Sequence, residues 1–303
     1  MNYLFVFNAK AKRYSREAET IILDQASKML QSSAISVAYT VPQSDPHAGQ
    51  YTVKDFAQRS RDIDCVVAVG GDGTINVVAA ALMQSGLGGR VPLGVIPYGT
   101  GNNLVRSYGL ERDSEKALIT IQQGYTVNLD IGIINQQHYF VNASFGFFPY
   151  LIARRVTKSL AGWTYEALRH IGFKPWPTRI RYTDADDRVI DLPSQRYFVG
   201  AILNTSHYGS ILHMAPDSIG DDGLFDVKLI REASVLANPL LLVIMLTGQY
   251  DLARNTTTLR ARRIEVVPDA TCHFETDGDT IPLHASYMVE MAGHIRLIVP
   301  ESH

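Results

Sequence analysis

The stretch Cys65-Val-Val-Ala-Val-Gly-Gly-Asp-Gly-Thr-Ile-Asn76 combines a short apolar run, a glycine-rich turn and the start of a second apolar run. The first run predicts a buried strand over residues 65–69, and the second predicts a helix over residues 75–83. At such a junction the first helical N–H groups have no partner within the helix, and the helix dipole adds positive charge. Because glycine lets a ligand approach the backbone closely, the turn predicts an anion site, most often for phosphate. Asp72 lies inside this site and needs a partner, such as a metal ion, a proton or a ribose hydroxyl.

A second turn of the same design follows in Leu93-Gly-Val-Ile-Pro-Tyr-Gly-Thr-Gly-Asn-Asn-Leu104. An apolar strand ends at Pro97, and a helix is expected to begin near Asn102. On successive strands of a parallel sheet, two such turns would lie side by side at the carboxyl edge, where ligands bind in open α/β sheets. A single glycine-rich turn is often only structural, so it is the pair that indicates a binding site.

Four motifs, in this order, resemble the catalytic domain of the diacylglycerol kinase and sphingosine kinase superfamily. They are Gly70-Gly-Asp-Gly-Thr74, Pro97-Tyr-Gly-Thr-Gly-Asn102, Ala215-Pro-Asp-Ser-Ile-Gly-Asp-Asp-Gly-Leu-Phe-Asp-Val227 and Thr276-Asp-Gly-Asp279. Within that superfamily the chain is most similar to the bacterial soluble lipid kinases. The NAD kinases share the first motif, but their later motifs fit this chain poorly. Neither a Walker A motif nor the protein-kinase signatures are present.

The resemblance implies a lipid kinase that uses ATP and Mg²⁺ to phosphorylate the hydroxyl of diacylglycerol or a related lipid. The nucleotide would contact both turns, the first loop and the end of the second strand. The residues expected to bind it are Asn8, Lys10, Thr40, Gly70, Gly71, Asp72, Gly73, Thr74, Asn76, Gly99, Thr100 and Asn102. Lys10 and Lys12 could neutralise phosphate, or they could simply belong to a solvated loop.

In the second half of the chain, the resemblance makes Asp277 the general base that takes the proton of the lipid hydroxyl. It puts Asp279 where the family has glutamate. Two nearby carboxylates can raise one pKa or share Mg²⁺. Without the resemblance, the Asp-Gly pair at Asp277 predicts only a hairpin turn. The resemblance also assigns a structural Mg²⁺ to Asp222 and the carbonyls of Ile219 and Leu224, oxygen ligands that suit a hard cation.

The chain departs from the family pattern at three positions. Val77 and Asp279 replace a common glutamate, and Asn103 replaces a common aspartate. Two potential anionic contacts to the metal network are therefore lost. These losses motivate one alternative, a catalytically weak nucleotide- or lipid-sensing protein. A NAD kinase-like enzyme with a soluble acceptor is a separate alternative.

Strand and helix signals alternate over residues 1–127 and predict an α/β nucleotide-binding domain, a parallel sheet covered by helices. One of those helices is expected around residues 53–61. From residue 128 to residue 303 strand signals dominate and predict an antiparallel β-rich domain for the lipid, with helices near residues 150–170 and 239–247. The reaction would occupy the cleft between the domains. The resemblance adds that the last strand packs back on the first domain.

Composition narrows the class of protein further. A formal net charge of −2 and a pI near 6.5 argue against a nucleic-acid partner. Two cysteines without metal-ligand spacing favour a reduced, cytoplasmic protein. The most apolar run, residues 240–246, is too short to span a bilayer, so any membrane contact is expected to be peripheral. Residues 147–173 could form an amphipathic helix on the membrane or pack on their own domain. Exposed strand edges would allow a homodimer.

Overall fold

The computed structural model of the chain forms two compact units. Unit 1 comprises residues 1–131 and 292–303, and unit 2 comprises residues 132–291. The structure describes residues 1–9, 14–30, 34–40, 63–99, 103–154, 162, 165–166, 169–170, 172–209, 212–232 and 255–301. The helices expected around residues 53–61 and 239–247 lie outside these ranges.

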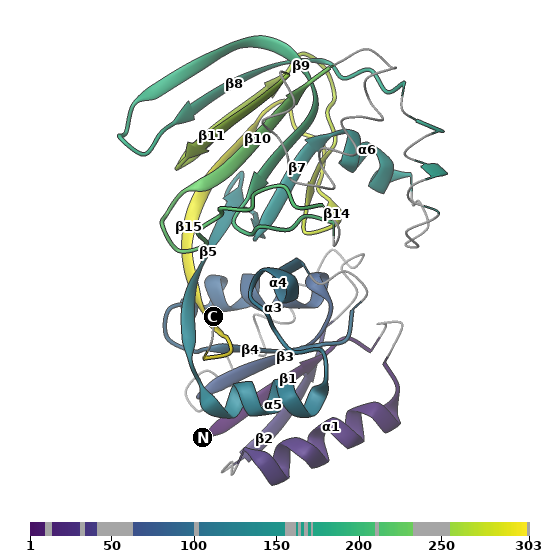
Figure 1. Ribbon diagram of the computed structural model, residues 1–303, viewed down its shortest axis with the longest axis vertical. Helices are drawn as coiled ribbons and strands as arrows, with labels where there is room; N and C mark the ends of the chain where they lie inside the picture. Colours follow the sequence, from purple (N-terminus) through teal and green to yellow (C-terminus); the bar gives the residue numbers. More distant parts are fainter. Residues whose placement is uncertain are drawn as a thin grey trace. The chain divides into compact units, whose positions relative to one another are not determined.

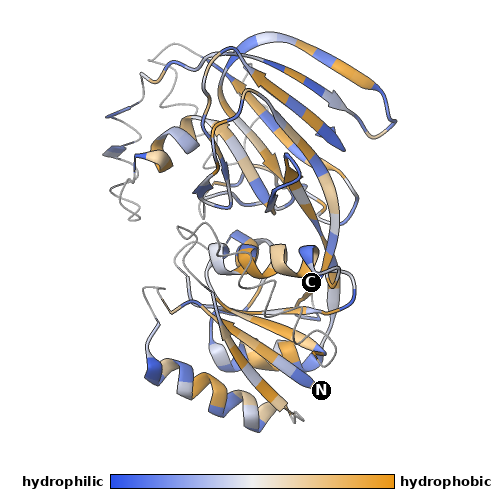
Figure 2. Ribbon diagram, turned by 180° about the vertical axis from the view of Figure 1, so that it is seen from behind, coloured by the Kyte–Doolittle hydropathy of each residue, from blue (hydrophilic) through white to orange (hydrophobic). Residues whose placement is uncertain are grey.

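Unit 1 is built on a parallel sheet with the strand order β2-β1-β3-β4-β15 (Figure 1). Consecutive residues of β1 and β3 are buried, as expected for strands covered by helices on both faces. In Figure 2 these strands are accordingly hydrophobic along most of their length. The strands are β1 (Asn2–Phe7), β2 (Ala34–Tyr39), β3 (Cys65–Gly70), β4 (Leu93–Pro97) and the last part of β15 (Tyr287–Ile298).

Four helices of unit 1 are described, and they cover both faces of the sheet (Figure 1). On one face, residues of β1 and β3 form a core cluster with Ile22 and Ile121 from two of the helices. The hydroxyl of Ser15 caps the first of these helices by accepting a hydrogen bond from the Ala18 N–H. The helices are α1 (Arg16–Met29), α3 (Asp72–Gln84), α4 (Asn103–Ser107) and α5 (Ser114–Gln123).

Unit 2 consists of antiparallel strands and one described helix of more than one turn. Among the described residues, the strands of this unit pair in antiparallel register. Many of these strands alternate between hydrophilic and hydrophobic residues in Figure 2. The elements are the end of β5 (Thr126–Ile134), β6 (His138–Phe140), β7 (Asn142–Gly146), α6 (Phe147–Ala153), β8 (Pro177–Thr183), β9 (Val189–Leu203), β10 (Phe225–Arg231), β11 (Thr256–Ala261), β12 (Arg263–Pro268), β13 (Phe274–Thr276), β14 (Asp279–Thr280) and the start of β15.

The long strand β9 joins two layers of unit 2. Its first half pairs with β8, and its second half pairs with β7 and β10. A core of apolar side chains lies between the layers, and it includes Phe145, Ile202, Phe225 and Val266. The sequence predicted only the second half of β9, because the first half has few buried positions. On the other face of the second layer, α6 packs its phenylalanines against β9.

The predicted fold class is confirmed: an α/β unit with a parallel sheet and a unit of antiparallel β-strands. The chain leaves unit 1 after Ile131, within β5, and returns to it at Ala292, within β15. The boundary expected at residue 127 also falls within β5. Of the helix expected near residues 150–170, α6 covers the residues up to Ala153, and only a few of the later positions are described.

Candidate functional site

The two glycine-rich turns of unit 1 touch each other at the carboxyl ends of β3 and β4. The N–H of Tyr98 donates to the carbonyl of Gly70 at 2.7 Å. A Cβ atom added to Gly71 would lie 2.9 Å from the Cα of Gly99. Gly71 has an ordinary extended backbone and is the N-cap of α3, so this close approach is what requires glycine there. The turns therefore present the N-terminus of α3 at the sheet edge where ligands bind in this architecture.

Three polar side chains gather at the same edge, from the ends of β1 and β2 and the start of α3. The amide of Asn8 donates to the hydroxyl of Thr74 at 3.3 Å. The N–H and hydroxyl of Thr40 donate to the carbonyl of Phe7, at 2.8 and 3.4 Å. A Cβ atom at Gly70 would lie 2.2 Å from the Thr74 hydroxyl, so the glycine leaves room for that side chain.

Asp72 is the first residue of α3, three positions earlier than the sequence predicted. Its Oδ2 atom accepts a hydrogen bond from the N–H of Asn103 at 3.1 Å. One partner of Asp72 is therefore the backbone of the second turn, and the helix dipole also favours its charge. This contact uses the backbone of residue 103, so the side chain that departs from the family pattern does not disturb it. Val77, another departure, is buried in α3.

For the other residues expected to bind nucleotide, the structure gives only a position in the chain or a degree of burial. Asn76 is buried in α3, and Gly73 belongs to the first turn of that helix. Lys10, Lys12, Thr100 and Asn102 lie outside the described residues.

Replacing Gly71 by alanine should disrupt the contact between the turns. The new methyl group would meet backbone atoms, which cannot move aside as a flexible side chain can. We expect a loss of stability of about 1–3 kcal/mol, together with weaker ATP binding. Urea unfolding and calorimetric titration with ATP would measure both. Gly172→Ala is the matched control for the loss of a glycine, since that residue has no positive φ and a Cβ atom added there would lie in open space. ATP affinity of Gly71→Ala equal to that of the wild type would contradict the expectation.

Asp277 and Gly278 form the two-residue turn between β13 and β14. Both have positive φ, 48° and 94°, and Thr276 pairs with Asp279 across the hairpin. Left-handed backbone at both central residues is the type I′ turn that favours an Asp-Gly pair. The structure thus has the hairpin that the sequence predicted without the resemblance. Asp277 and Asp279 are both partly exposed, so a turn that is structurally required also presents carboxylates to solvent.

The backbone of β7 and the residue before it fix the orientation of the Asp277 carboxylate. Its two oxygens accept hydrogen bonds from the N–H groups of Val141 and Asn142, both at 2.9 Å. The N–H of Asp277 donates in return to the carbonyl of Asn142 at 2.9 Å. A carboxylate oxygen has two lone pairs, so each oxygen can accept a further proton or hydrogen bond.

Glu275, which the sequence did not single out, lies fully buried beneath this hairpin. It accepts hydrogen bonds from Ser144 Oγ at 2.9 Å, from Tyr208 Oη at 2.5 Å and from the N–H of Gly278 at 2.7 Å. Burial raises the pKa of Glu275 to about 7. Burial, and then the charge of Glu275, raise the pKa of Tyr208 well above its ordinary value. The only sequence signal for Glu275 is its place in a short strand directly before an Asp-Gly turn.

Asp222, which the resemblance assigns to a structural Mg²⁺, has partners within the chain. Asp222 Oδ1 accepts from the N–H of Leu224 at 3.0 Å, and Oδ2 accepts from the guanidinium of Arg260. The side chain of Ile219 is half-exposed. Each oxygen of the Asp222 carboxylate keeps a lone pair, but the guanidinium of Arg260 already supplies the positive charge that Mg²⁺ would bring to this carboxylate. In the described part of the chain, no three His, Cys, Asp or Glu side chains converge on one point.

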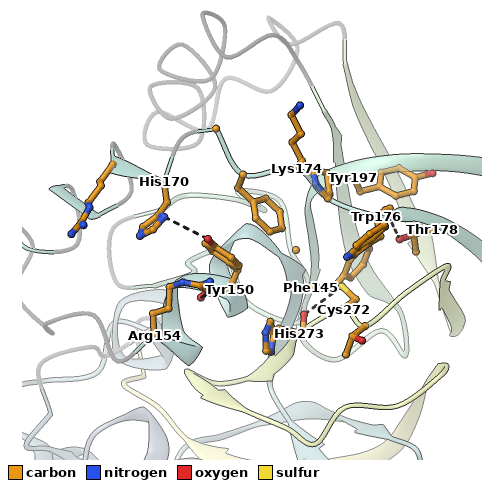
Figure 3. A pocket seen from close by; sticks show the side chains of 16 residues that line it. Phe145, Tyr150, Arg154, His170, Lys174, Trp176, Thr178, Tyr197, Cys272 and His273 are labelled. Atoms are coloured by element: carbon orange, nitrogen blue, oxygen red, sulfur yellow. Dashed lines mark hydrogen bonds between the residues drawn. The ribbon is translucent and has the colours of Figure 1, made fainter.

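A cavity of about 630 Å³ opens in unit 2 beside α6 (Figure 3). Its walls are aromatic and its polar groups are mainly basic. Trp176 is 54% exposed, and the guanidinium of Arg154 stacks 3.6 Å from the ring centre of Tyr150. Among the described residues, no aspartate or glutamate lines the cavity. The lining residues are Phe145, Gly146, Tyr150, Arg154, Arg169, His170, Gly172, Phe173, Lys174, Pro175, Trp176, Thr178, Tyr197, Thr271, Cys272 and His273.

Two basic groups of the cavity differ in their surroundings. Burial, and then the charge of Arg154, lower the pKa of His273, so its imidazole tends to be neutral. His170 lies 3.5 Å from the hydroxyl of Tyr150 (Figure 3). It also lies 3.4 Å from the carboxylate of Glu166. The lining thus offers both fixed cations and neutral hydrogen-bonding groups.

None of the described helices has the length and apolar content needed to cross a membrane.

Comparison with known proteins assigns both halves of the chain. Residues 2–134 match the diacylglycerol kinase catalytic domain, and residues 152–299 match the YegS C-terminal NAD kinase beta sandwich-like domain. A diacylglycerol kinase of Bacillus subtilis (strain 168) is 28% identical over 248 residues, which are 80% of this chain and 79% of that protein. A Yersinia enterocolitica protein named "Probable lipid kinase YegS-like" is 29% identical over 72% of this chain and 73% of its own.

The fold itself is shared with a solved structure. The crystal structure of a diacylglycerol kinase from Bacillus anthracis str. Sterne superimposes with a TM-score of 0.70 and covers 99% of this chain and 97% of its own. At 18% sequence identity this likeness speaks for the fold alone. The chain thus combines a diacylglycerol kinase catalytic domain with a YegS C-terminal domain, and the relatives reported above are named as a diacylglycerol kinase and a probable lipid kinase.

Proposed function

We propose that the chain transfers the γ-phosphate of ATP to the hydroxyl of diacylglycerol or a related lipid at a membrane surface. The observation that carries the proposal is the contact between the two glycine-rich turns at one edge of the unit 1 sheet. That contact brings together backbone N–H groups and a helix N-terminus, which suit the phosphates of a nucleotide. The names of the relatives support a lipid as the acceptor.

On the donor side, ATP would enter as its Mg²⁺ complex, so that this metal ion is part of the substrate. Asp72, Gly73 and Thr74 would bind the nucleotide at the start of α3. The hydrogen bond from Asn8 would hold the Thr74 hydroxyl in place for this contact. Phosphoryl transfer needs mainly positioning and charge neutralisation, which such a rigid edge can supply.

On the acceptor side, Asp277 would take the proton of the lipid hydroxyl. The freed oxygen forms a bond to the γ-phosphorus, the bond from that phosphorus to the bridging oxygen breaks, and ADP leaves. The two N–H groups that hold the Asp277 carboxylate leave lone pairs for this proton. Proton transfer by a positioned side chain contributes about 10²–10⁴-fold to a rate.

The cavity of unit 2 would receive the apolar part of the lipid. Its volume lies within the range of about 300–1,000 Å³ that is usual for ligand pockets. Its aromatic walls suit acyl chains, and its cations suit the phosphate and carbonyl oxygens of a membrane surface. The exposed Trp176 would lie near the interface between lipid and water.

Replacing Trp176 by alanine should lower binding to lipid vesicles severalfold and raise the KM for the lipid acceptor. Because this side chain is more than half exposed, folding should be little affected. Vesicle sedimentation and initial-rate kinetics would measure the two effects. Tyr165→Ala is the matched control, because Tyr165 is 63% exposed but does not line the cavity. Equal effects of the two substitutions would argue against the role of the cavity.

The direct test is incubation of the purified protein with radiolabelled ATP, Mg²⁺ and mixed micelles that contain diacylglycerol or total bacterial lipid. A labelled lipid is the expected result, and its mobility would identify the acceptor. Labelled NADP from NAD without any lipid would favour a soluble acceptor. ATP binding without transfer to any acceptor would favour a sensor.

A further inference from the structure

The segment before β10 brings one carboxylate toward another by a local turn. Gly223 has a φ of +73°, and the N–H of Leu224 donates to Asp222 Oδ1. This side chain-to-backbone turn fixes the Asp222 carboxylate just ahead of the strand. Asp226 follows in β10 and is only 13% exposed. The two carboxylates are thus held at the start of one strand, where their charges require compensation.

The pairing of β10 with β11 supplies that compensation. In the antiparallel register, Asp226 lies directly opposite Arg260. The Nε atom of Arg260 is 3.6 Å from Asp226 Oδ1, and its Nη2 atom donates to Asp222 Oδ2. One guanidinium therefore reaches both carboxylates. Its planar fork of donors suits such bridging better than an ammonium group would.

A divalent cation at Asp222 would add positive charge beside a guanidinium that already compensates the carboxylate. The resemblance assigned Mg²⁺ to the same carboxylate, yet Arg260 already brings a positive charge to its Oδ2 atom, and a backbone N–H binds its Oδ1 atom. Mg²⁺ also gives up its hydration shell reluctantly. Unlike a dissolved ion, the guanidinium is part of the chain and is present at any Mg²⁺ concentration.

We propose that in this chain Arg260 takes the place of the structural cation, so that unit 2 is folded and stable without Mg²⁺ at Asp222. The positive charge that stabilises the turn before β10 then comes from the Arg260 side chain in β11. Removal of the guanidinium would leave two neighbouring carboxylates and the carbonyl groups of the turn, a set of oxygen ligands that a hard cation can bind.

The test is thermal unfolding of the full chain without nucleotide, in millimolar MgCl₂ and in EDTA. For the wild-type protein, we expect the two melting temperatures to agree within about 1 °C. For Arg260→Met, which keeps an apolar side chain of similar length, we expect a melting temperature about 3 °C lower in EDTA. Most of this loss should be recovered in MgCl₂.

Arg263→Met is the matched control, because Arg263 also pairs across strands, 3.3 Å from Glu290, in a place where no metal is expected. This variant should not respond to MgCl₂. The proposal is overturned if the wild-type melting temperature rises by several degrees in MgCl₂, or if Arg260→Met responds to MgCl₂ no more than the control does. Because the readout is stability without nucleotide, the result does not depend on whether the protein phosphorylates a lipid.

Discussion

Asp277→Asn is expected to abolish phosphate transfer to lipid while ATP binding survives. Asparagine cannot take the proton of the acceptor hydroxyl, and loss of a general base lowers rates by about 10²–10⁴-fold. Asparagine is also the substitution that the turn tolerates best, since residue 277 has a φ of 48° and asparagine adopts left-handed backbone more readily than most residues. The nucleotide site belongs to the other unit and should be unaffected.

The measurement is the initial rate of labelled lipid formation, together with calorimetric titration with ATP. Asp279→Asn is the informative comparison, because it removes the other carboxylate of the same hairpin. If Asp279 were the base, that variant would lose turnover and Asp277→Asn would keep it. Thermal unfolding should accompany both assays, since the asparagine amide would face one of the two N–H groups that now bind the carboxylate. Retention of wild-type turnover by Asp277→Asn would reject the proposed role.

The second large effect is expected from the buried Glu275. Replacing it by leucine removes the acceptor for three donors, of which the N–H of Gly278 has the fewest alternatives. Ser144 and Tyr208 can still bond to each other, since their hydroxyl oxygens lie 2.8 Å apart. Each buried polar group left without a partner costs about 1–3 kcal/mol, so we expect Glu275→Leu to lose about 2–4 kcal/mol. Urea unfolding at neutral pH would measure this loss.

The same residue predicts a dependence of stability on pH. The pKa of Glu275 is about 7 in the folded chain, against an ordinary value of 4.5. The folded state therefore holds this proton more tightly than the unfolded state does. Stability should fall as pH rises from 4.5 through 7, by a total of about 3 kcal/mol for this group.

Glu275→Gln is the control for this pH effect. Glutamine can accept from Gly278 with its oxygen and donate to the hydroxyls of Ser144 and Tyr208, but it does not titrate. As pH rises from 4.5 through 7, the wild type should therefore lose stability relative to Glu275→Gln. If both proteins show the same pH dependence between pH 4.5 and pH 8, this titration of Glu275 is wrong.

The features that the sequence predicted best are those that depend on the order of neighbouring residues. The buried strand β3, the helix after it and the contact between the two turns follow from apolar runs that glycines interrupt. The hairpin at Asp277 follows from the preference of Asp-Gly for left-handed backbone. The fold class follows from the alternation of strands and helices in one half and its absence in the other. In each case the residues that decide the structure are neighbours in the sequence.

What the sequence missed depends on pairing between distant segments. The burial of Glu275 requires β13 to pair with β7, which brings Ser144 alongside it. The partner of Asp222 is Arg260, and only the register of β10 and β11 places it there. The cavity of unit 2 is lined by residues from α6, β7, β8 and β9 and from the segments before β8 and before β13. No pattern within one segment carries this information.

The return of the chain to unit 1 within β15 has a consequence for the order in which the protein folds. A ribosome releases β1, β2, β3 and β4 long before the strand that pairs with β4 at Leu93 and Leu297. The edge of the nascent parallel sheet at β4 therefore stays unpaired with β15 while all of unit 2 is synthesised. Such long-range pairing is slow and leaves a strand edge exposed to aggregation. Translation of residues 132–291 is thus the period in which a chaperone would matter most for this chain.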